Sequence, residues 1–193
     1  VQAARVMAWL EELLQTRWPN LKVHVTTVSE QWCGCSIAGP KSRECLNKCV
    51  EDPSVMTNEN LPFMGVIKTT LHSGIPCRIA RISFSGELAF EVYVPSDYAN
   101  GMMDLLWKEA QSAEGCLYGL ECLGALRIEK GHVTGAELDG RGTIDDVGLG
   151  KMASTKKSYI GSAMRKRGVL GYDNRSRLVG IFAKNRKEIF DAG

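Results

Sequence analysis

The sequence lacks several features that would point directly to a partner. Its formal net charge is only +2 over 193 residues, without the strong positive excess typical of nucleic-acid-binding domains. No apolar run approaches the roughly 20 residues that a membrane-spanning helix needs, and no signal-peptide pattern is present. No Gly-x-Gly-x-x-Gly follows a predicted strand, so we expect no flavin or nicotinamide site here. We therefore expect neither nucleic acid nor membrane as a partner.

Histidine is scarce, and the cysteines follow no familiar ligand pattern. The three histidines are scattered and have no Ser or Cys partner that their spacing supports, which argues against a catalytic triad. Cys33 and Cys35 followed by Cys45 and Cys49 do not match common zinc spacings. We interpret them as core thiols in preference to a metal site or a disulfide. Unpaired thiols favour a reducing, cytoplasmic location.

The apolar residues, 44% of the chain, alternate or recur with the periods of strands and helices. The predicted helices cover 2–17, 40–50, a segment starting at 96, and 120–130, and the predicted strands cover 21–28, 31–37, 63–71, 77–94 as a hairpin, and 177–182. The first two strands are expected to pair with each other across Ser29-Glu30. This order predicts an α+β fold with mixed or antiparallel sheets and flanking helices.

The most informative stretch is the hairpin segment at residues 81–94. Polar and apolar residues alternate around Ser85-Gly86, which predicts two strands joined by a turn at this pair. In that register Ala80 lies opposite Glu91. Alternation then places one set of side chains in the core: Leu88, Phe90, Val92 and Val94.

The other face of this predicted hairpin carries an aromatic ring and two carboxylates, from Phe84, Glu87 and Glu91. A flat heteroaromatic ligand with N–H donors suits such a surface, because a ring can stack on it and a carboxylate can accept two donors. From periodicity alone a solvated strand face is favoured, because most glutamates in strands are exposed.

Residues 84–92, Phe-Ser-Gly-Glu-Leu-Ala-Phe-Glu-Val, resemble the folate-binding signature of the aminomethyltransferase family. That family includes the glycine-cleavage T-protein and enzymes that oxidise dimethylglycine and sarcosine. Residues 126–132, 137–141 and 145–152 are most similar to the C-terminal part of the α subunits of heterotetrameric sarcosine oxidases. The resemblance extends over nearly the whole chain.

The resemblance implies a domain organisation. Residues 1–153 would form a folate-binding aminomethyltransferase-like region without its N-terminal part. Residues 154–193 would be a connector and the first strand or strands of a truncated C-terminal β-barrel. Because the chain starts without Met inside a helical pattern, we expect it to be a fragment of a longer polypeptide.

The implied function is that of an oxidoreductase region in sarcosine catabolism. It would position tetrahydrofolate to capture the one-carbon unit when sarcosine is oxidatively demethylated to glycine, giving 5,10-methylenetetrahydrofolate. Implied partners are the β, γ and δ subunits, with FAD, FMN and NAD elsewhere in the whole enzyme. The family's catalytic aspartate would precede residue 1, so we expect no catalytic residue in this chain and no activity from it alone.

The resemblance also implies the folate-binding residues. Glu91 occupies the position whose carboxylate hydrogen-bonds the pterin ring, and Phe84 the position of a nearby aromatic. Glu87 and Arg81 complete the predicted set. The alternatives are an exposed Glu91 paired with a lysine, a core Phe84, and a Glu87 paired with Arg81 or Arg78.

Two other functions stay open. One is a T-protein-like aminomethyltransferase or another folate-dependent methyltransferase, which Leu123 disfavours because the T-protein branch has a ligand-assisting arginine there. The other is a non-catalytic folate-binding or subunit-assembly module.

The Gly-rich connector after residue 137 carries charged residues that could suggest a metal site. Asp139, Arg141 and Asp145 have no histidine at ligand spacing, so we interpret them as a turn lock bridged by Arg141. The basic residues at 156–157 and 165–167 are interpreted as a solvated surface or a subunit contact.

Overall fold

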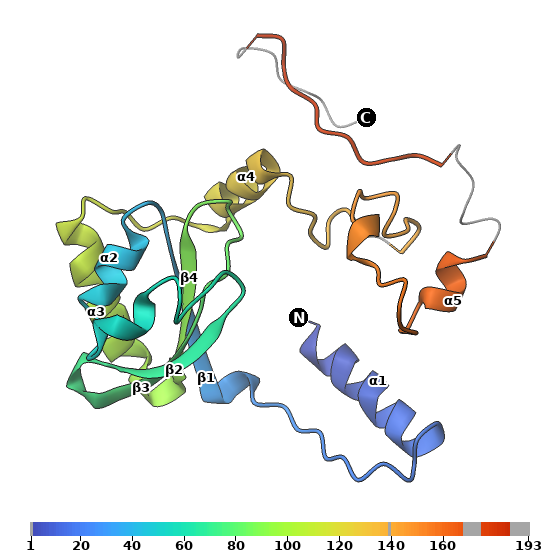
Figure 1. Cartoon of the computed structure of the whole chain (residues 1–193), viewed down its shortest axis with the longest axis horizontal. Coiled ribbons are helices and arrows are strands. Elements are labelled where there is room, and N and C mark those ends of the chain that lie inside the picture. Colours follow the sequence, from blue (N-terminus) through green and yellow to red (C-terminus); the bar gives the residue numbers. More distant parts are fainter. Residues whose placement is uncertain (1, 139, 168–174, 186–193) are drawn as a thin grey trace. The chain divides into compact units, whose positions relative to one another are not determined.

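The computed structural model describes residues 2–138, 140–167 and 175–185. The chain divides into two compact units, Val1–Leu123 and Gly124–Gly193, which we describe separately. The regular elements, drawn in Figure 1, are α1 (Ala3–Thr16), β1 (Trp32–Ala38), α2 (Ser42–Asn47), β2 (Val66–Leu71), β3 (Ile75–Ala80), β4 (Ala89–Pro95), α3 (Ala99–Ser112), α4 (Leu120–Lys130) and α5 (Ser162–Arg165). Among the residues described, no helix is long and apolar enough to cross a bilayer.

The first unit is built on a four-stranded antiparallel sheet with the strand order β1-β4-β3-β2. Strand β1 pairs with β4 along its whole length, from Trp32 opposite Pro95 to Ala38 opposite Ala89. Helices α2 and α3 pack against this sheet and against each other. The predicted α+β class is confirmed.

Alternation along the strands sends one set of side chains toward α2 and α3. The predicted core positions Phe90, Val92 and Val94 are fully buried, and Leu88 packs at their edge. The rest of the core comes mainly from the helices, the loop after α2 and the neighbouring strands: Leu46, Cys49, Val50, Met56, Leu61, Leu71, Ile75, Cys77, Ile79, Met102 and Leu106. Burial of this apolar surface drives the folding of the first unit.

The register of the β3–β4 hairpin is the predicted one, with Ala80 opposite Glu91. The predicted two-residue turn is wrong, because β3 ends at Ala80, β4 begins at Ala89, and residues 81–88 form a loop. The backbone of Arg81 leaves the ladder to bond Met64 and Gly65. Phe84 and Glu87 therefore lie in the loop, outside the strand face that carries Glu91.

Two predicted strands are not formed. At 21–28 the Val23 N–H donates to the Leu21 carbonyl, and this tight turn interrupts the predicted strand. The predicted pairing of the first two strands is therefore wrong, and β1 pairs with β4 instead. Long-range pairing prevails because β1 also packs Cys33, Cys35 and Ile37 against the core. Residues 177–182 do not form a strand either, and the Leu178 N–H donates to the carbonyl of Asp146, which lies in a turn, at 2.8 Å. By contrast, α4 covers its predicted residues.

The interpretation of the cysteines as core thiols is confirmed for Cys45 and Cys49, which are buried beside α3. Burial raises the pKa of Cys49 to about 12 and that of Cys77 to about 11, so both thiols stay protonated. All seven cysteines are free. Within the described ranges, no group of three His, Cys, Asp or Glu residues could hold a metal ion.

Truncating Phe90 tests the proposed core. Phe90→Ala should lower the free energy of unfolding by about 3–5 kcal/mol, because it removes a fully buried ring that also lies under the Arg43 guanidinium. Phe182→Ala is the matched control, since that ring is 93% exposed. Urea denaturation followed by circular dichroism measures both. Equal losses would contradict the assignment of Phe90 to the core.

Candidate functional site on the outer face of the sheet

The sheet face opposite α2 and α3, which we call the outer face, carries polar and aromatic side chains. They alternate with the core residues and therefore point away from them. The outer face is made by Trp32, Gly34, Ser36, Lys68, Arg78, Glu91 and Tyr93.

Glu91 is half-buried near the start of β4, between Ser36 of β1 and Ala80 of β3. The Tyr93 hydroxyl, two residues along the strand, donates a hydrogen bond to Glu91 Oε2. This bond, together with burial, raises the pKa of Tyr93 to about 12. Tyr93 thus keeps its proton at neutral pH and fixes the carboxylate. The remaining lone pairs of the Glu91 carboxylate can accept further donors.

A glycine lets the Tyr93 ring approach β1. Gly34 is opposite Tyr93 in the ladder, and a Cβ added at Gly34 would lie 2.8 Å from Tyr93 Cε1 and 2.9 Å from Cδ1. Any other residue would displace the ring. The sequence analysis missed both residues, although a glycine inside a strand signals a close approach and the period-2 pattern places Tyr93 beside Glu91.

Trp32 and Arg78 form a second contact on the outer face. The Arg78 guanidinium carbon lies 4.2 Å from the centroid of the Trp32 ring, a cation–π geometry. Since Arg78 is opposite Tyr93 in the ladder, the outer face combines a carboxylate, a phenol, an indole and a guanidinium. Neither Trp32 nor Arg78 was among the predicted folate-binding residues.

Arg81 has a structural role at the start of the 81–88 loop. Its Nη1 donates to Asn58 Oδ1 at 2.9 Å and to the Leu61 carbonyl at 3.2 Å. Its backbone N–H donates to the Gly65 carbonyl at 2.9 Å. These bonds tie the loop to residues 58–65. Because Arg81 binds Asn58 and Arg78 stacks on Trp32, the structure favours these contacts over a pair of either arginine with Glu87.

The other end of the loop is anchored at Leu88. The Leu88 carbonyl accepts hydrogen bonds from the Gly39 N–H and the Ser42 hydroxyl, both at 2.9 Å. Between the anchors, Phe84 is half-buried and Glu87 is exposed. Ser85 Oγ is buried, and the described residues offer it no hydrogen-bond partner. The loop thus places an unsatisfied hydroxyl in the segment that leads into Glu91.

The second unit contains a tight ion pair between Arg127 and Glu137, with Nη1 2.7 Å from Oε1. Glu137 Oε2 also accepts the Thr134 N–H at 2.8 Å. The hydrogen bond from Arg127, the largest cause, lowers the pKa of Glu137 to about 2. Arg127 in addition donates to the His132 carbonyl at 3.3 Å, so it ties the end of α4 to the following turn.

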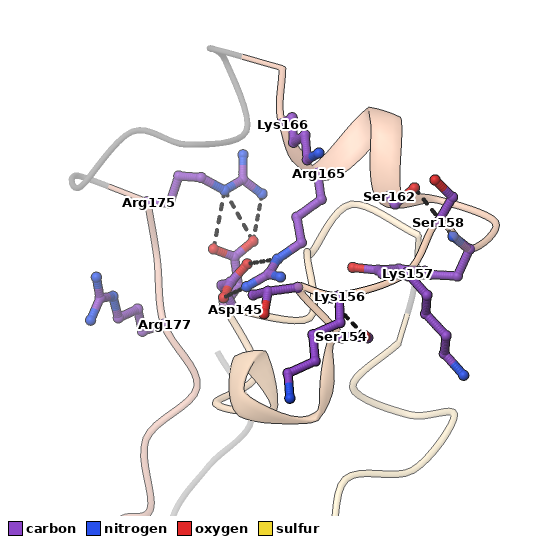
Figure 2. A pocket seen from close by; sticks show the side chains of 13 residues that line it. Asp145, Ser154, Lys156, Lys157, Ser158, Ser162, Arg165, Lys166, Arg175 and Arg177 are labelled. Atoms are coloured by element: carbon purple, nitrogen blue, oxygen red, sulfur yellow. Dashed lines mark hydrogen bonds and ion pairs between the residues drawn. The ribbon is translucent and has the colours of Figure 1, made fainter.

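The charged connector contains two arginine–aspartate pairs that the sequence did not predict. Asp145 pairs with Arg165 and Asp146 with Arg175, each at 2.7 Å (Figure 2). The arginines that hold these two aspartates come from later in the chain, and the predicted bridge through Arg141 stays a prediction. Asp139 lies outside the described residues. No sequence spacing could have revealed these pairs, because 20 and 29 residues separate their members.

Gly34→Ala tests the approach of Tyr93 to β1. The added Cβ should displace the ring, weaken its bond to Glu91 and lower the Tyr93 pKa from about 12 toward the ordinary 10.0. Ultraviolet titration of tyrosinate, with Tyr93→Phe subtracted, measures that pKa. Gly119→Ala, where nothing lies within 4 Å of an added Cβ, should leave it unchanged. An unaltered Tyr93 pKa in Gly34→Ala would refute the packing argument.

Glu137→Gln tests the Arg127 pair through pH. Because folding lowers the Glu137 pKa from its ordinary 4.5 to about 2, the pair stabilises the protein fully above pH 4.5. The variant should therefore melt at a lower temperature than the wild type near neutral pH, and the difference should vanish as the pH falls through about 2. The control is Glu129→Gln, an exposed change on α4, the helix that carries Arg127. A pH-independent difference would exclude this linkage.

Comparison with known proteins places these observations in a family. The family model described as the GCVT N-terminal domain matches residues 1–157. The chain is 38% identical to sarcosine oxidase subunit alpha of Rhizobium meliloti (strain 1021) over 193 residues, 99% of this chain and 19% of that protein. It is also 38% identical to the subunit of the same name from Corynebacterium sp. (strain U-96) over 180 residues, 93% of this chain and 18% of that protein.

An aminomethyltransferase of Halothermothrix orenii is 31% identical over 173 residues, 86% of this chain and 46% of that protein. The chain spans about a fifth of the length of the sarcosine oxidase subunits that it matches. The predicted resemblance is confirmed. The chain belongs to the GCVT N-terminal domain family, and it matches the aminomethyltransferase-like region of sarcosine oxidase α subunits over nearly its whole length.

Proposed function

We propose that this chain is the folate-binding region of a sarcosine oxidase α subunit and that the outer face with the 81–88 loop holds the pterin ring. One observation carries the proposal: a half-buried carboxylate, Glu91, is fixed by a protonated phenol, Tyr93, on a face rich in aromatic surface. The similarity to sarcosine oxidase α subunits, at 38% identity, supports it.

The chemistry of these residues suits a pterin. A carboxylate offers about four acceptor positions and Tyr93 occupies one, so Glu91 can still accept two N–H donors from an aminopyrimidinone edge. The Trp32 and Tyr93 rings offer surfaces on which a flat heterocycle can stack. These groups differ in chemistry, as recognition of an asymmetric ring requires.

The four predicted folate-binding residues take different parts in this proposal. Glu91 contacts the pterin directly, while Phe84 and Glu87 contribute from the loop between the two strands. Arg81 acts through the loop, because its guanidinium is committed to Asn58 and the Leu61 carbonyl. Its contribution is therefore to hold the loop in place.

The proposed reaction is the oxidative demethylation of sarcosine to glycine in the whole cytoplasmic enzyme. Tetrahydrofolate supplies the nucleophilic nitrogen that takes up the one-carbon unit, giving 5,10-methylenetetrahydrofolate. This chain contributes binding and orientation, which lower the barrier by placing the reactants together. FAD, FMN and NAD, and the β, γ and δ subunits, belong to the remainder of that enzyme. We propose residues 1–153 as its folate-binding region and residues 154–193 as a connector and the start of a C-terminal β-barrel.

A T-protein-like aminomethyltransferase is the second candidate. The 31% identity to the Halothermothrix orenii aminomethyltransferase favours it. Leu123, which lies in α4, disfavours it because it cannot supply the charge of an arginine. Methylene transfer from a lipoyl-bound aminomethyl group by the full-length protein would decide for this candidate over sarcosine oxidation.

Glu91→Gln tests the proposed site. The substitution keeps the shape but replaces a charged acceptor by an amide, and a hydrogen bond to a charged group contributes about 1.5–3 kcal/mol. We expect the affinity for 5-formyltetrahydrofolate to fall about 10- to 100-fold in isothermal titration of the full-length subunit.

Glu51→Gln, an exposed change after α2, is the control and should bind as the wild type does. Equal affinity of Glu91→Gln and the wild type would exclude Glu91 as a pterin contact. If the full-length protein oxidises sarcosine without binding folate, the proposed reaction is supported and the proposed folate site is excluded.

A further inference from the structure

The second unit contains a pocket that the proposed folate site does not use. It has a volume of about 760 Å³, within the range of small-molecule sites. Three segments line it: residues 145–146, 154–166 in part, and 175–177. In Figure 2 the Arg165 side chain points toward Asp145, whereas the Lys157, Lys166 and Arg177 side chains extend away from this pair.

The pocket lining has an excess of positive charge. It contains six basic side chains and two carboxylates, which leaves four positive charges without an acidic counterpart in the lining. The basic residues are Lys156, Lys157, Arg165, Lys166, Arg175 and Arg177. This excess is local, because the whole chain has a formal net charge of only +2. Cations gathered in one concave surface repel one another and attract an anion.

The two carboxylates are already engaged by arginines. Arg165 binds Asp145 through two bonds, Nε to Oδ2 at 2.7 Å and Nη2 to Oδ1 at 2.8 Å. Arg175 binds Asp146 through Nε at 3.0 Å and Nη2 at 2.7 Å, both to Oδ2. These pairs hold the two guanidinium groups in place. The aspartates therefore shape the pocket and leave its remaining cations uncompensated.

The lysines are the cations available to a ligand. Lys156, Lys157 and Lys166 are exposed, and the contacts of the described residues include no ion pair for them. Arg177 lines the pocket from the described segment that begins at residue 175. A lysine ammonium brings three donors and a mobile stem, so it can adapt to an anion.

Hydroxyl groups complete the lining, from Ser154, Thr155, Ser158, Tyr159 and Ser162. The Ser154 hydroxyl oxygen accepts the Lys156 N–H at 3.1 Å, and that of Ser162 accepts the Tyr159 N–H at 3.4 Å. Each of these hydroxyls keeps its hydrogen for donation, because the bond uses only an oxygen lone pair. Cations combined with hydroxyl donors are the groups that bind phosphate and carboxylate oxygens.

We propose that this pocket binds a small polyanion, a ligand with two or more phosphate groups or three or more carboxylate groups. A single phosphate group has a charge of at most about −2 near neutral pH, less than the four uncompensated positive charges, whereas two linked phosphate groups or the three carboxylates of citrate come closer to them. The ligand bridges the 154–166 segment and Arg177, which approach the pocket from separate parts of the second unit.

Isothermal titration of the full chain with inorganic pyrophosphate tests this inference, and citrate in a parallel titration distinguishes a phosphate from a carboxylate ligand. The double variant Lys156→Gln, Lys157→Gln should weaken binding at least about 10-fold. Arg177→Gln, on the other lining segment, should weaken it about 3- to 10-fold. Added salt should weaken wild-type binding, because exposed charges are screened.

The matched control is Lys151→Gln, Arg167→Gln. It removes the same charge from exposed positions of the second unit that do not line the pocket, and it should change the affinity less than about 2-fold. Circular dichroism checks that each variant is folded. The proposal fails if neither pyrophosphate nor citrate binds, if the control weakens binding as much as the pocket variants do, or if orthophosphate binds as tightly as pyrophosphate.

Discussion

The pairing of β1 with β4 is the constraint on which the first unit depends. These strands are about 50 residues apart in the chain, yet they pair over seven residues, and β4 becomes a central strand between β1 and β3. A central strand with one face on the helices must alternate strictly, which buries Phe90, Val92 and Val94. The same alternation turns Glu91 and Tyr93 to the outer face. Core and candidate site are therefore two sides of one strand.

The outer face shows how a glycine can organise a polar site. Gly34 has no side chain, so the Tyr93 ring lies against β1 and its hydroxyl reaches Glu91. The hydrogen bond to Glu91 raises the pKa of this hydroxyl to about 12, and a fixed donor gives the carboxylate a fixed orientation. The 81–88 loop beside it is anchored at Arg81 and at Leu88. A ligand would meet groups that are already in position, which limits the entropy lost on binding.

The second unit depends on arginine–carboxylate pairs more than on apolar burial. No fully buried hydrophobic residue belongs to its described part, whereas Arg127, Arg165 and Arg175 each bind a carboxylate at 2.7 Å. Bidentate geometry makes such pairs directional, so they define local shape where a core is small. The pairs of Arg165 and Arg175 also line the basic pocket. Within the pocket lining, Arg165 and Arg175 are thus held by aspartates, whereas Lys156, Lys157 and Lys166 are exposed.

The sequence by itself determined the α+β class, α4, the register of Ala80 with Glu91 and the buried face of β4, because these follow from local periodicity and short separations. It also carried the family signature around Glu91. It could not determine the partner of β1, the absence of a strand at 21–28, or the Tyr93–Gly34 and Arg165–Asp145 contacts. These features depend on which distant segments of the chain come into contact. The free energy of burying one common core and of pairing distant charges determines those contacts. Only the tertiary structure decides them, since hydrophobic burial is non-directional and carries no information on sequence distance.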